Sequence, residues 1–127
     1  ESVPQLENAF VMTRANFMGK DPDPKINEFY DRFSKTTGWE LARSHAAEGY
    51  CAIQLYAEAV KRAWSVDGKA VTQAFEGFKD VECITGTTTF TPRWHMPFKR
   101  SIAIHEIRDK TFVFITKFVP EKILLPE

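Results

Sequence analysis

Few side chains in this sequence are of the types that do chemistry, and their spacing matches no catalytic or metal-binding motif. His45, His95 and His105 each lack a second ligand at a metal-binding spacing such as HxxxH, so the sequence predicts no metal site. It also contains no GxSxG, P-loop or GxGxxG motif, and it gives no support for an enzyme or for a bound cofactor.

His105 lies beside Glu106 in an expected strand. Neighbouring residues of a strand point to opposite faces of the sheet, so these two side chains cannot form an acid–base dyad by themselves. We expect His105 to be a cross-strand residue at the surface or at an interface.

The two cysteines, Cys51 and Cys83, leave two states open. An oxidising compartment would allow a disulfide between them, whereas two buried thiols need no special environment. Of these two states, we expect two buried thiols. Cys51 falls among apolar residues in the middle of an expected helix, where burial raises a thiol pKa and makes a nucleophile improbable.

The Ser44-His45 pair stands where a long helix is expected to begin. Ser44 can cap that helix, and the free N–H groups of its first turn favour a carboxylate or another anion. His45 is then either an exposed polar residue that ends the preceding loop or a contact for a small ligand. Local physics favours the first interpretation. The Trp94-His95-Met96 segment likewise indicates a surface loop anchored by Trp94, with a ligand-wall role as the alternative.

The helix itself is expected over Ser44–Trp64, because its apolar residues recur at helical spacing. One apolar line comprises Ala46, Tyr50, Ile53, Ala57, Val60 and Trp64, and a second comprises Ala47, Cys51, Leu55, Ala59 and Ala63. A helix with so wide an apolar face is expected to be largely covered. Glu58 should pair with Lys61 and Arg62 on the exposed side.

Two further helices are expected from their capping signals. Asp23 and Pro24 begin a helix that ends near Lys35 and is followed by Gly38. Asp67 caps a helix over Gly68–Phe78.

The strands are expected at Ala9–Thr13, Gly86–Thr91, Ser101–Ile107 and Thr111–Val119. The first is continuously apolar and suits a strand buried on both faces. In the last, Phe112, Phe114 and Phe118 should share one face. This element order indicates an α+β protein or part of an α/β fold.

Composition excludes some functions. Seventeen basic and seventeen acidic side chains give a net charge of zero. This argues against binding to nucleic acid or to an anionic membrane through overall charge. The chain opens ESVPQLENAF, without a signal-peptide pattern, and no apolar run reaches the roughly 20 residues that span a bilayer. We expect a mature product or a piece of a longer protein.

Several stretches occur in an order that resembles a known family. They are AFVMT (9–13), FYDRFSKTTG (29–38), HAAEGYCAIQLYAEAVKRAWSVDGKAVTQAF (45–75) and the segment from ITGTTTF to the C-terminus (84–127). The chain resembles the C-terminal part of type I periplasmic solute-binding proteins of the branched-chain amino acid (Leu/Ile/Val) type. It departs from the family pattern at Cys51 and at Trp94-His95-Met96.

The resemblance implies an α/β fold, a C-terminal fragment of a two-lobed protein whose ligand lies in the cleft between the lobes. Residues 8–13 would be a crossover strand, 14–98 the helical part of the first lobe, and 99–127 the returning strands and C-terminal tail. A sheet without its first strands would expose an edge, so the fragment could form a homodimer or exchange strands.

The resemblance also implies a function. The protein would be the periplasmic solute-binding component of an ABC importer, binding an amino acid or small carboxylate by lobe closure, with the permease as partner and no catalysis. Ser44, His45 and Ala46 would contact the ligand. A sensory receptor domain of the same fold and a small stand-alone α+β enzyme remain as alternatives.

Overall fold

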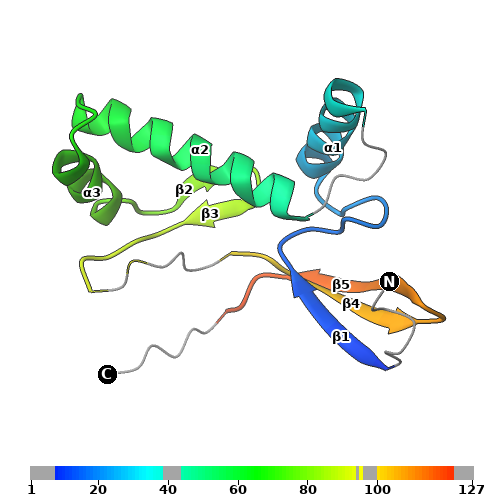
Figure 1. Cartoon of the computed structure of the whole chain (residues 1–127). Helices are drawn as coiled ribbons and strands as arrows, with labels where there is room; N and C mark the ends of the chain where they lie inside the picture. The colour runs from blue at the N-terminus through cyan, green and yellow to red at the C-terminus, as the bar shows by residue number, and fades with distance from the viewer. Residues whose placement is uncertain (1–7, 39–43, 94, 96–99, 122–127) are drawn as a thin grey trace.

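The computed structural model describes residues 8–38, 44–93, 95 and 100–121. The elements follow in the order β1 (Ala9–Thr13), α1 (Pro24–Thr37), α2 (Ser44–Ala63), α3 (Gly68–Glu76), β2 (Val81–Cys83), β3 (Gly86–Thr88), β4 (Ile102–Arg108) and β5 (Thr111–Phe118). Figure 1 shows two regions: α2, α3 and the β2–β3 hairpin pack together, and β1, β4 and β5 form a separate sheet. In the described part of the chain no helix is long and apolar enough to cross a membrane.

The capping residues define α1 and α3 as the sequence predicts. The Asp23 carboxylate accepts from Lys25 N, and Gly38 closes α1 with a left-handed φ of 73°, a conformation that favours glycine. The Asp67 carboxylate accepts from the backbone N–H groups of Lys69 and Ala70 at the start of α3. Both helices therefore begin where their caps predict.

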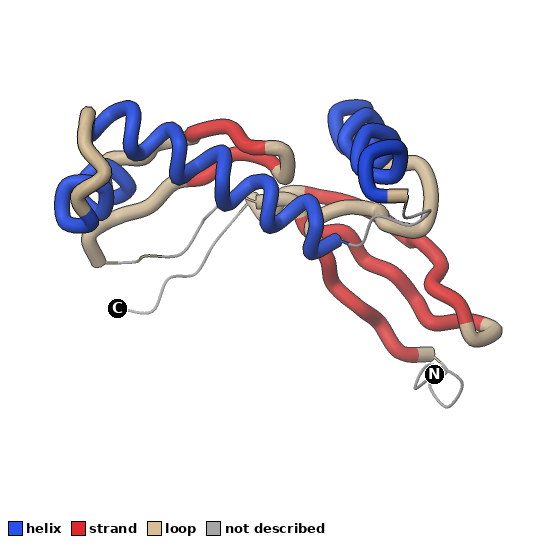
Figure 2. The backbone as a smooth tube through the Cα atoms, turned by 45° about the horizontal axis from the view of Figure 1, so that its top comes forward, coloured by secondary structure: helices blue, strands red, loops and turns tan. Residues whose placement is uncertain are grey.

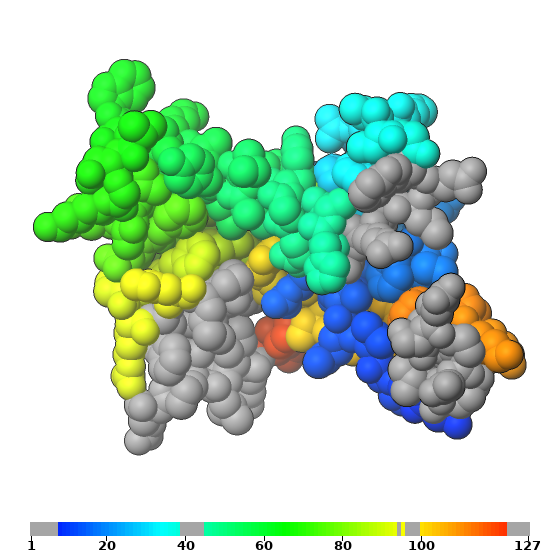
Figure 3. All heavy atoms as spheres, in the orientation of Figure 1, coloured from blue at the N-terminus to red at the C-terminus, as the bar shows by residue number. Residues whose placement is uncertain are grey.

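The buried face of α2 is the second of its two apolar lines. Leu55 and Ala59 join Val71, Phe78 and Val81 in the main apolar cluster, between α2, α3 and the hairpin. The first line points outward: Ile53 is 67% exposed and Trp64 is 90% exposed. Figure 3 shows the outer side of α2 at the surface. The expectation of a largely covered helix is wrong for this chain, because α3 and the hairpin cover only one side.

The sheet has the order β1-β4-β5, and each pairing is antiparallel. Its inner face carries three fully or nearly fully buried residues of β4: Ala103, His105 and Ile107. The loop after β1 covers this face through Phe17, whose ring lies 4.7 Å from the His105 ring. Figure 2 shows the three strands side by side, extending away from α2.

β1 is not buried on both faces as its apolar run predicts. Phe10 is 64% exposed and Met12 is 72% exposed. They pair with Glu106 and Ile104 of β4 on the outer face of the sheet, which no described element covers. β1 is also an edge strand.

β5 contains a register shift, which changes which of its side chains face the inside of the sheet. His105 pairs with Phe114 and Ile104 pairs with Thr116, so Ile115 is an extra residue. Such a bulge reverses the alternation beyond it. Lys117, which pairs with Ala103, is therefore on the inner face. The expectation that Phe118 shares a face with Phe112 and Phe114 is wrong.

Candidate functional site

The predicted ligand contacts lie at the first turn of α2. The helix begins at Ser44 itself; the residue before it, and the Ser44 side chain, lie outside what the structure describes, so the predicted cap remains untested. His45 is exposed, Ala46 is half-buried and Ala47 is fully buried. This turn presents His45 outward and anchors the opposite side of the helix in the interior.

One turn further along α2, Glu48 joins the ends of two strands. Its carboxylate lies 3.7 Å from Arg14 Nε and 3.3 Å from Arg100 Nη1. Arg14 directly follows β1, and Arg100 lies two residues before β4. Burial lowers the pKa of Arg100, and the Glu48 carboxylate opposes that shift. Glu48 therefore connects α2 to the end of β1 and to the segment just before β4.

Cys51 and Cys83 form a disulfide, with their Cα atoms 5.2 Å apart. The expectation of two free thiols is wrong, because Cys51 lies on the buried side of α2, opposite the end of β2. Arg100 Nη2 lies 3.1 Å from Cys51 Sγ and also donates to Thr85 Oγ1. The disulfide, Glu48 and the two arginines make one cluster, which we call the junction cluster.

A second polar group fills the space between the sheet and the loop before α1. Lys117 Nζ lies 2.7 Å from Asp21 Oδ1, and the same carboxylate accepts from the backbone N–H of Asn16 at 2.6 Å. His105 Nε2 lies 3.3 Å from Asn16 Oδ1. Together these four residues join β4 and β5 to the loop.

His105 is fully buried in this group, so the expectation of a surface or interface residue is wrong. Its ring packs against Phe17 and Phe114, and its Nδ1 atom has no hydrogen-bond partner among the described residues. Burial lowers the pKa of His105, and Asp21 partly opposes this. The imidazole is consequently a neutral core group at pH 7.

The pKa of Tyr30, in α1, is affected by one carboxylate from each of the two polar clusters. Burial raises its pKa to about 12, and the negative charges of Asp21 and Glu48 add to the shift. Its hydroxyl is buried without a hydrogen-bond partner in the described part of the chain. A phenol in this position stays neutral at ordinary pH, and none of the described residues is placed to take its proton.

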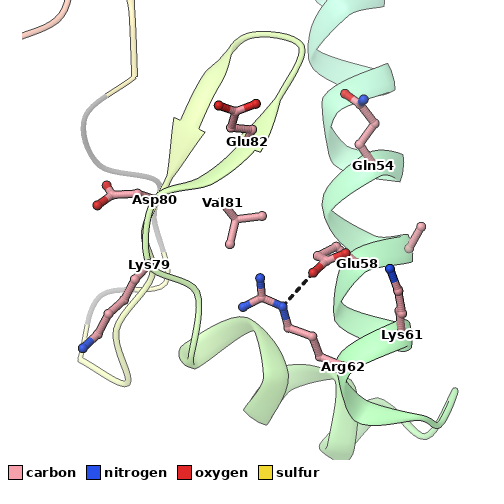
Figure 4. Close-up of a pocket in the computed structure, with 9 residues that line it drawn as sticks. Gln54, Glu58, Lys61, Arg62, Lys79, Asp80, Val81 and Glu82 are labelled. Atoms are coloured by element: carbon pink, nitrogen blue, oxygen red, sulfur yellow. Dashed lines mark hydrogen bonds and ion pairs between the residues drawn. The ribbon is translucent and has the colours of Figure 1, made fainter.

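A surface groove formed by described residues lies away from the predicted contacts. It has a volume of about 590 Å³ and lies between the second half of α2 and the segment Lys79–Glu82. Figure 4 shows that its lining is charged, with Arg62 bonded to Glu58 at 2.8 Å as the sequence predicts. His45 does not line it. The mixed charges and open shape do not define a specific ligand.

His95, the described residue of the Trp94-His95-Met96 segment, is exposed and bonds to Glu76 Oε1 at 3.0 Å. It lines a small hollow of about 290 Å³ with Phe75 and Phe90. Trp94 and Met96 lie outside the described residues. Among the residues that are described, no group of three His, Cys, Asp or Glu side chains could hold a metal ion.

The charged residues that connect the sheet to the helical region were not predicted from the sequence. Arg14, Asp21, Glu48, Arg100 and Lys117 are far apart in the chain and belong to no local motif. The one available signal was position: Arg14 directly follows the expected strand 9–13, and Arg100 directly precedes the expected strand 101–107. A charge at the end of a buried strand must be exposed or paired.

The fold and the sequence together define the class: the chain belongs to the periplasmic binding protein family, whose model matches residues 3–111. The family and fold inferred from the sequence are thereby confirmed. No curated protein matches the chain.

Two solved structures are similar to this chain. A leucine-binding protein of Thermotoga maritima has 17% sequence identity and a TM-score of 0.69 over 91% of this chain. A putative branched-chain amino acid ABC transporter protein of Rhodospirillum rubrum has 24% identity and a TM-score of 0.61 over 88%. At these identities the likeness shows the fold. The chain spans 32% of the length of each.

Proposed function

We propose that this chain is part of the extracytoplasmic solute-binding component of an ABC importer. The observation that carries the proposal is the family match over residues 3–111. The ligand would be an amino acid or another small carboxylate, bound by closure of two lobes without catalysis. The permease of the importer would receive the closed form. The two similar structures, a leucine-binding protein and a putative branched-chain amino acid ABC transporter protein, agree with this ligand class.

The division of the chain into lobes is part of the proposal. Residues 8–13 would cross between lobes, residues 14–98 would belong to the first lobe, and residues 99–127 would return to the second. The pairing of β1 with β4 supports this division, because β1 runs from the separate sheet toward the helical region and β4 runs back away from it (Figure 1). Arg14 and Arg100, bound to Glu48, lie where the two strands meet the helices.

We place the ligand contact at Ser44, His45 and Ala46. The first turn of a helix offers backbone N–H donors and a positive dipole end to a carboxylate. The exposure of His45 supports a contact made from outside the helix. Ala47, buried on the opposite side, fixes the direction of that turn.

The disulfide supports an extracytoplasmic location. Disulfides form and persist in oxidising compartments such as the periplasm and are rare in the cytosol. Cys51 and Cys83 are bonded within the apolar contact between α2 and β2, so the bond belongs to the folded structure.

The exposed edge of the sheet supports self-association of this chain. Phe10 and Met12 are exposed on β1, and β1 is an edge strand. An apolar edge with free backbone groups is a template for strand pairing. A homodimer or a strand exchange through β1 would cover it.

The function is tested by a thermal-shift screen of the full-length protein against branched-chain amino acids, aromatic amino acids and small carboxylates. A ligand that binds only the native state at 100 times its Kd adds about 2.7 kcal/mol of apparent stability. The matched controls are amino alcohols that lack the carboxylate. Shifts with the acids and none with the alcohols support the proposal; no shift with any acid contradicts it.

A further inference from the structure

The two sulfur atoms of the disulfide differ in their surroundings. Cys51 is 1% exposed within α2, whereas Cys83 is partly exposed at the end of β2. Arg100 Nη2 lies 3.1 Å from Cys51 Sγ and 3.7 Å from Cys83 Sγ. Cys51 is therefore the more deeply buried partner of the disulfide and lies closer to the arginine, whereas Cys83 belongs to a residue that is partly exposed.

The charges of the junction cluster do not cancel. Arg100 is acted on by one anion, Glu48, and by one further cation, Arg14. Two arginines and one carboxylate give the cluster a formal charge of +1, and Arg100 is the cation that lies next to Cys51. A thiolate on Cys51 would balance this charge, and a neighbouring arginine is one of the features that stabilise a protein thiolate.

We propose that the Cys51–Cys83 bond is a thiol-exchange site in which a small thiol attacks Cys83 and Cys51 leaves as a thiolate beside Arg100. The incoming thiolate forms a new S–S bond to Cys83 Sγ as the Cys83–Cys51 bond breaks. The electron pair of the broken bond and the negative charge pass to Cys51 Sγ. One disulfide replaces another, so this step needs no further oxidant or reductant.

Exchange would remove the covalent link between α2 and the hairpin while the hydrogen bonds at the hairpin turn remain. The disulfide joins α2 directly to the hairpin, and Thr85 in the hairpin turn accepts from Arg100. Ser101 Oγ lies 3.3 Å from Thr85 O, so it too ties the turn to the start of β4. Gln54 Oε1, which accepts from Ile84 N at 2.9 Å, would still hold the hairpin on α2. The modified state is therefore a loosened form of the folded protein, and it does not depend on solute binding.

The direction of attack is tested on the unchanged protein. The folded protein is incubated with a graded concentration of reduced glutathione, quenched with acid and N-ethylmaleimide, and mapped by peptide mass spectrometry. Glutathione on Cys83 with maleimide on Cys51 supports the proposal. Glutathione mainly on Cys51, or no mixed disulfide at millimolar glutathione, overturns it.

The role of Arg100 is tested through the thiol that it faces. In Cys83→Ser, the Cys51 thiol titrates by ultraviolet absorbance, and we expect a pKa below the ordinary value of about 8.5. Adding Arg100→Gln should raise that pKa, whereas adding Arg108→Gln, an exposed arginine at the end of β4, should leave it unchanged. A Cys51 pKa at or above the ordinary value overturns the proposal. The mapping experiment stands even if Arg100→Gln fails to fold.

Discussion

Lys117 and Asp21 form a buried ion pair across 96 positions of sequence, with Nζ 2.7 Å from Oδ1. The Asp21 side chain is 0% exposed and that of Lys117 is 11% exposed. The pair joins the inner face of β5 to the loop before α1, and the Asp21 carboxylate also orders that loop by accepting from the backbone N–H groups of Asn16 and Asp23. It is the longest-range side-chain pairing among those described here, and it ties the sheet to the helical region.

Replacing Lys117 with methionine should destabilise the protein by about 3 kcal/mol. The substitution keeps much of the side-chain volume but leaves the Asp21 carboxylate buried without its counter-charge, which costs far more than losing a surface pair. Urea unfolding measures the loss. Lys110→Met, at the exposed turn between β4 and β5, is the matched control and should cost almost nothing. A loss below 1 kcal/mol for Lys117→Met would contradict the buried pair.

The disulfide should contribute about 4 kcal/mol to stability. It closes a loop with a sequence separation of 32 residues, and a cross-link of that length removes chain entropy from the unfolded state by this order. The double variant Cys51→Ala/Cys83→Ala should show this loss in urea unfolding. Adding a reductant should destabilise the parent and leave the double variant unchanged; equal stability of the oxidised parent and the double variant would refute the estimate.

Local signals in the sequence predict the elements of this fold well. Asp23, Asp67 and Gly38 mark helix ends whose hydrogen bonds form within a few residues, so nothing distant needs to be known. The strand Ala9–Thr13 is also correct: its hydrogen bonds reach the distant β4, but its short apolar run is a local signal. Capping and turn chemistry are local, and local chemistry is visible in a single sequence.

The predictions that are wrong concern features that depend on residues distant in the sequence. Both apolar lines of α2 are plausible as the buried side, and only the position of the hairpin selects the line with Leu55. The bulge at Ile115 places Lys117 on the inner face, although alternation alone predicts the opposite. The disulfide requires the end of β2 to meet the middle of α2. These long-range contacts produce no periodic pattern in the sequence.

The buried histidine should make stability depend on pH. The pKa of His105 is lowered in the folded protein by burial, so the unfolded chain takes up a proton first as the pH falls. The free energy of unfolding should therefore be fully maintained above the unfolded value of about 6.5 and decrease as the pH falls below it. Urea unfolding between pH 7.5 and 5.5 measures this decrease.

The variant His105→Gln should remove that part of the pH dependence, because glutamine does not titrate and can still bond to Asn16. His45→Gln, which removes an exposed histidine, is the matched control and should retain the decrease. If the parent and His105→Gln lose stability equally on acidification, the buried imidazole is not its source.

The edge strand should drive concentration-dependent association of this chain. Met12→Lys places a charge on the exposed face of β1, and charged side chains on edge strands oppose edge-to-edge pairing. We expect the variant to raise the dimer dissociation constant about tenfold or more, which corresponds to roughly 1.4 kcal/mol. Sedimentation velocity over a concentration series measures it. Val66→Lys, at an exposed apolar residue outside the sheet, is the control; if both variants associate like the parent, β1 is not the contact.

His45 should contribute to ligand affinity without contributing to the stability of the unliganded protein. In the full-length protein, His45→Ala should weaken binding by about 1–2 kcal/mol, the range for truncating one contact residue, if His45 makes the proposed ligand contact. Its side chain is exposed and does not pack in the core. Isothermal calorimetry measures the affinity, and melting without ligand should be nearly unchanged. His95→Ala, also exposed but bonded to Glu76 at the end of α3, should leave affinity intact. If His45→Ala binds as the parent does, the ligand does not contact the first turn of α2.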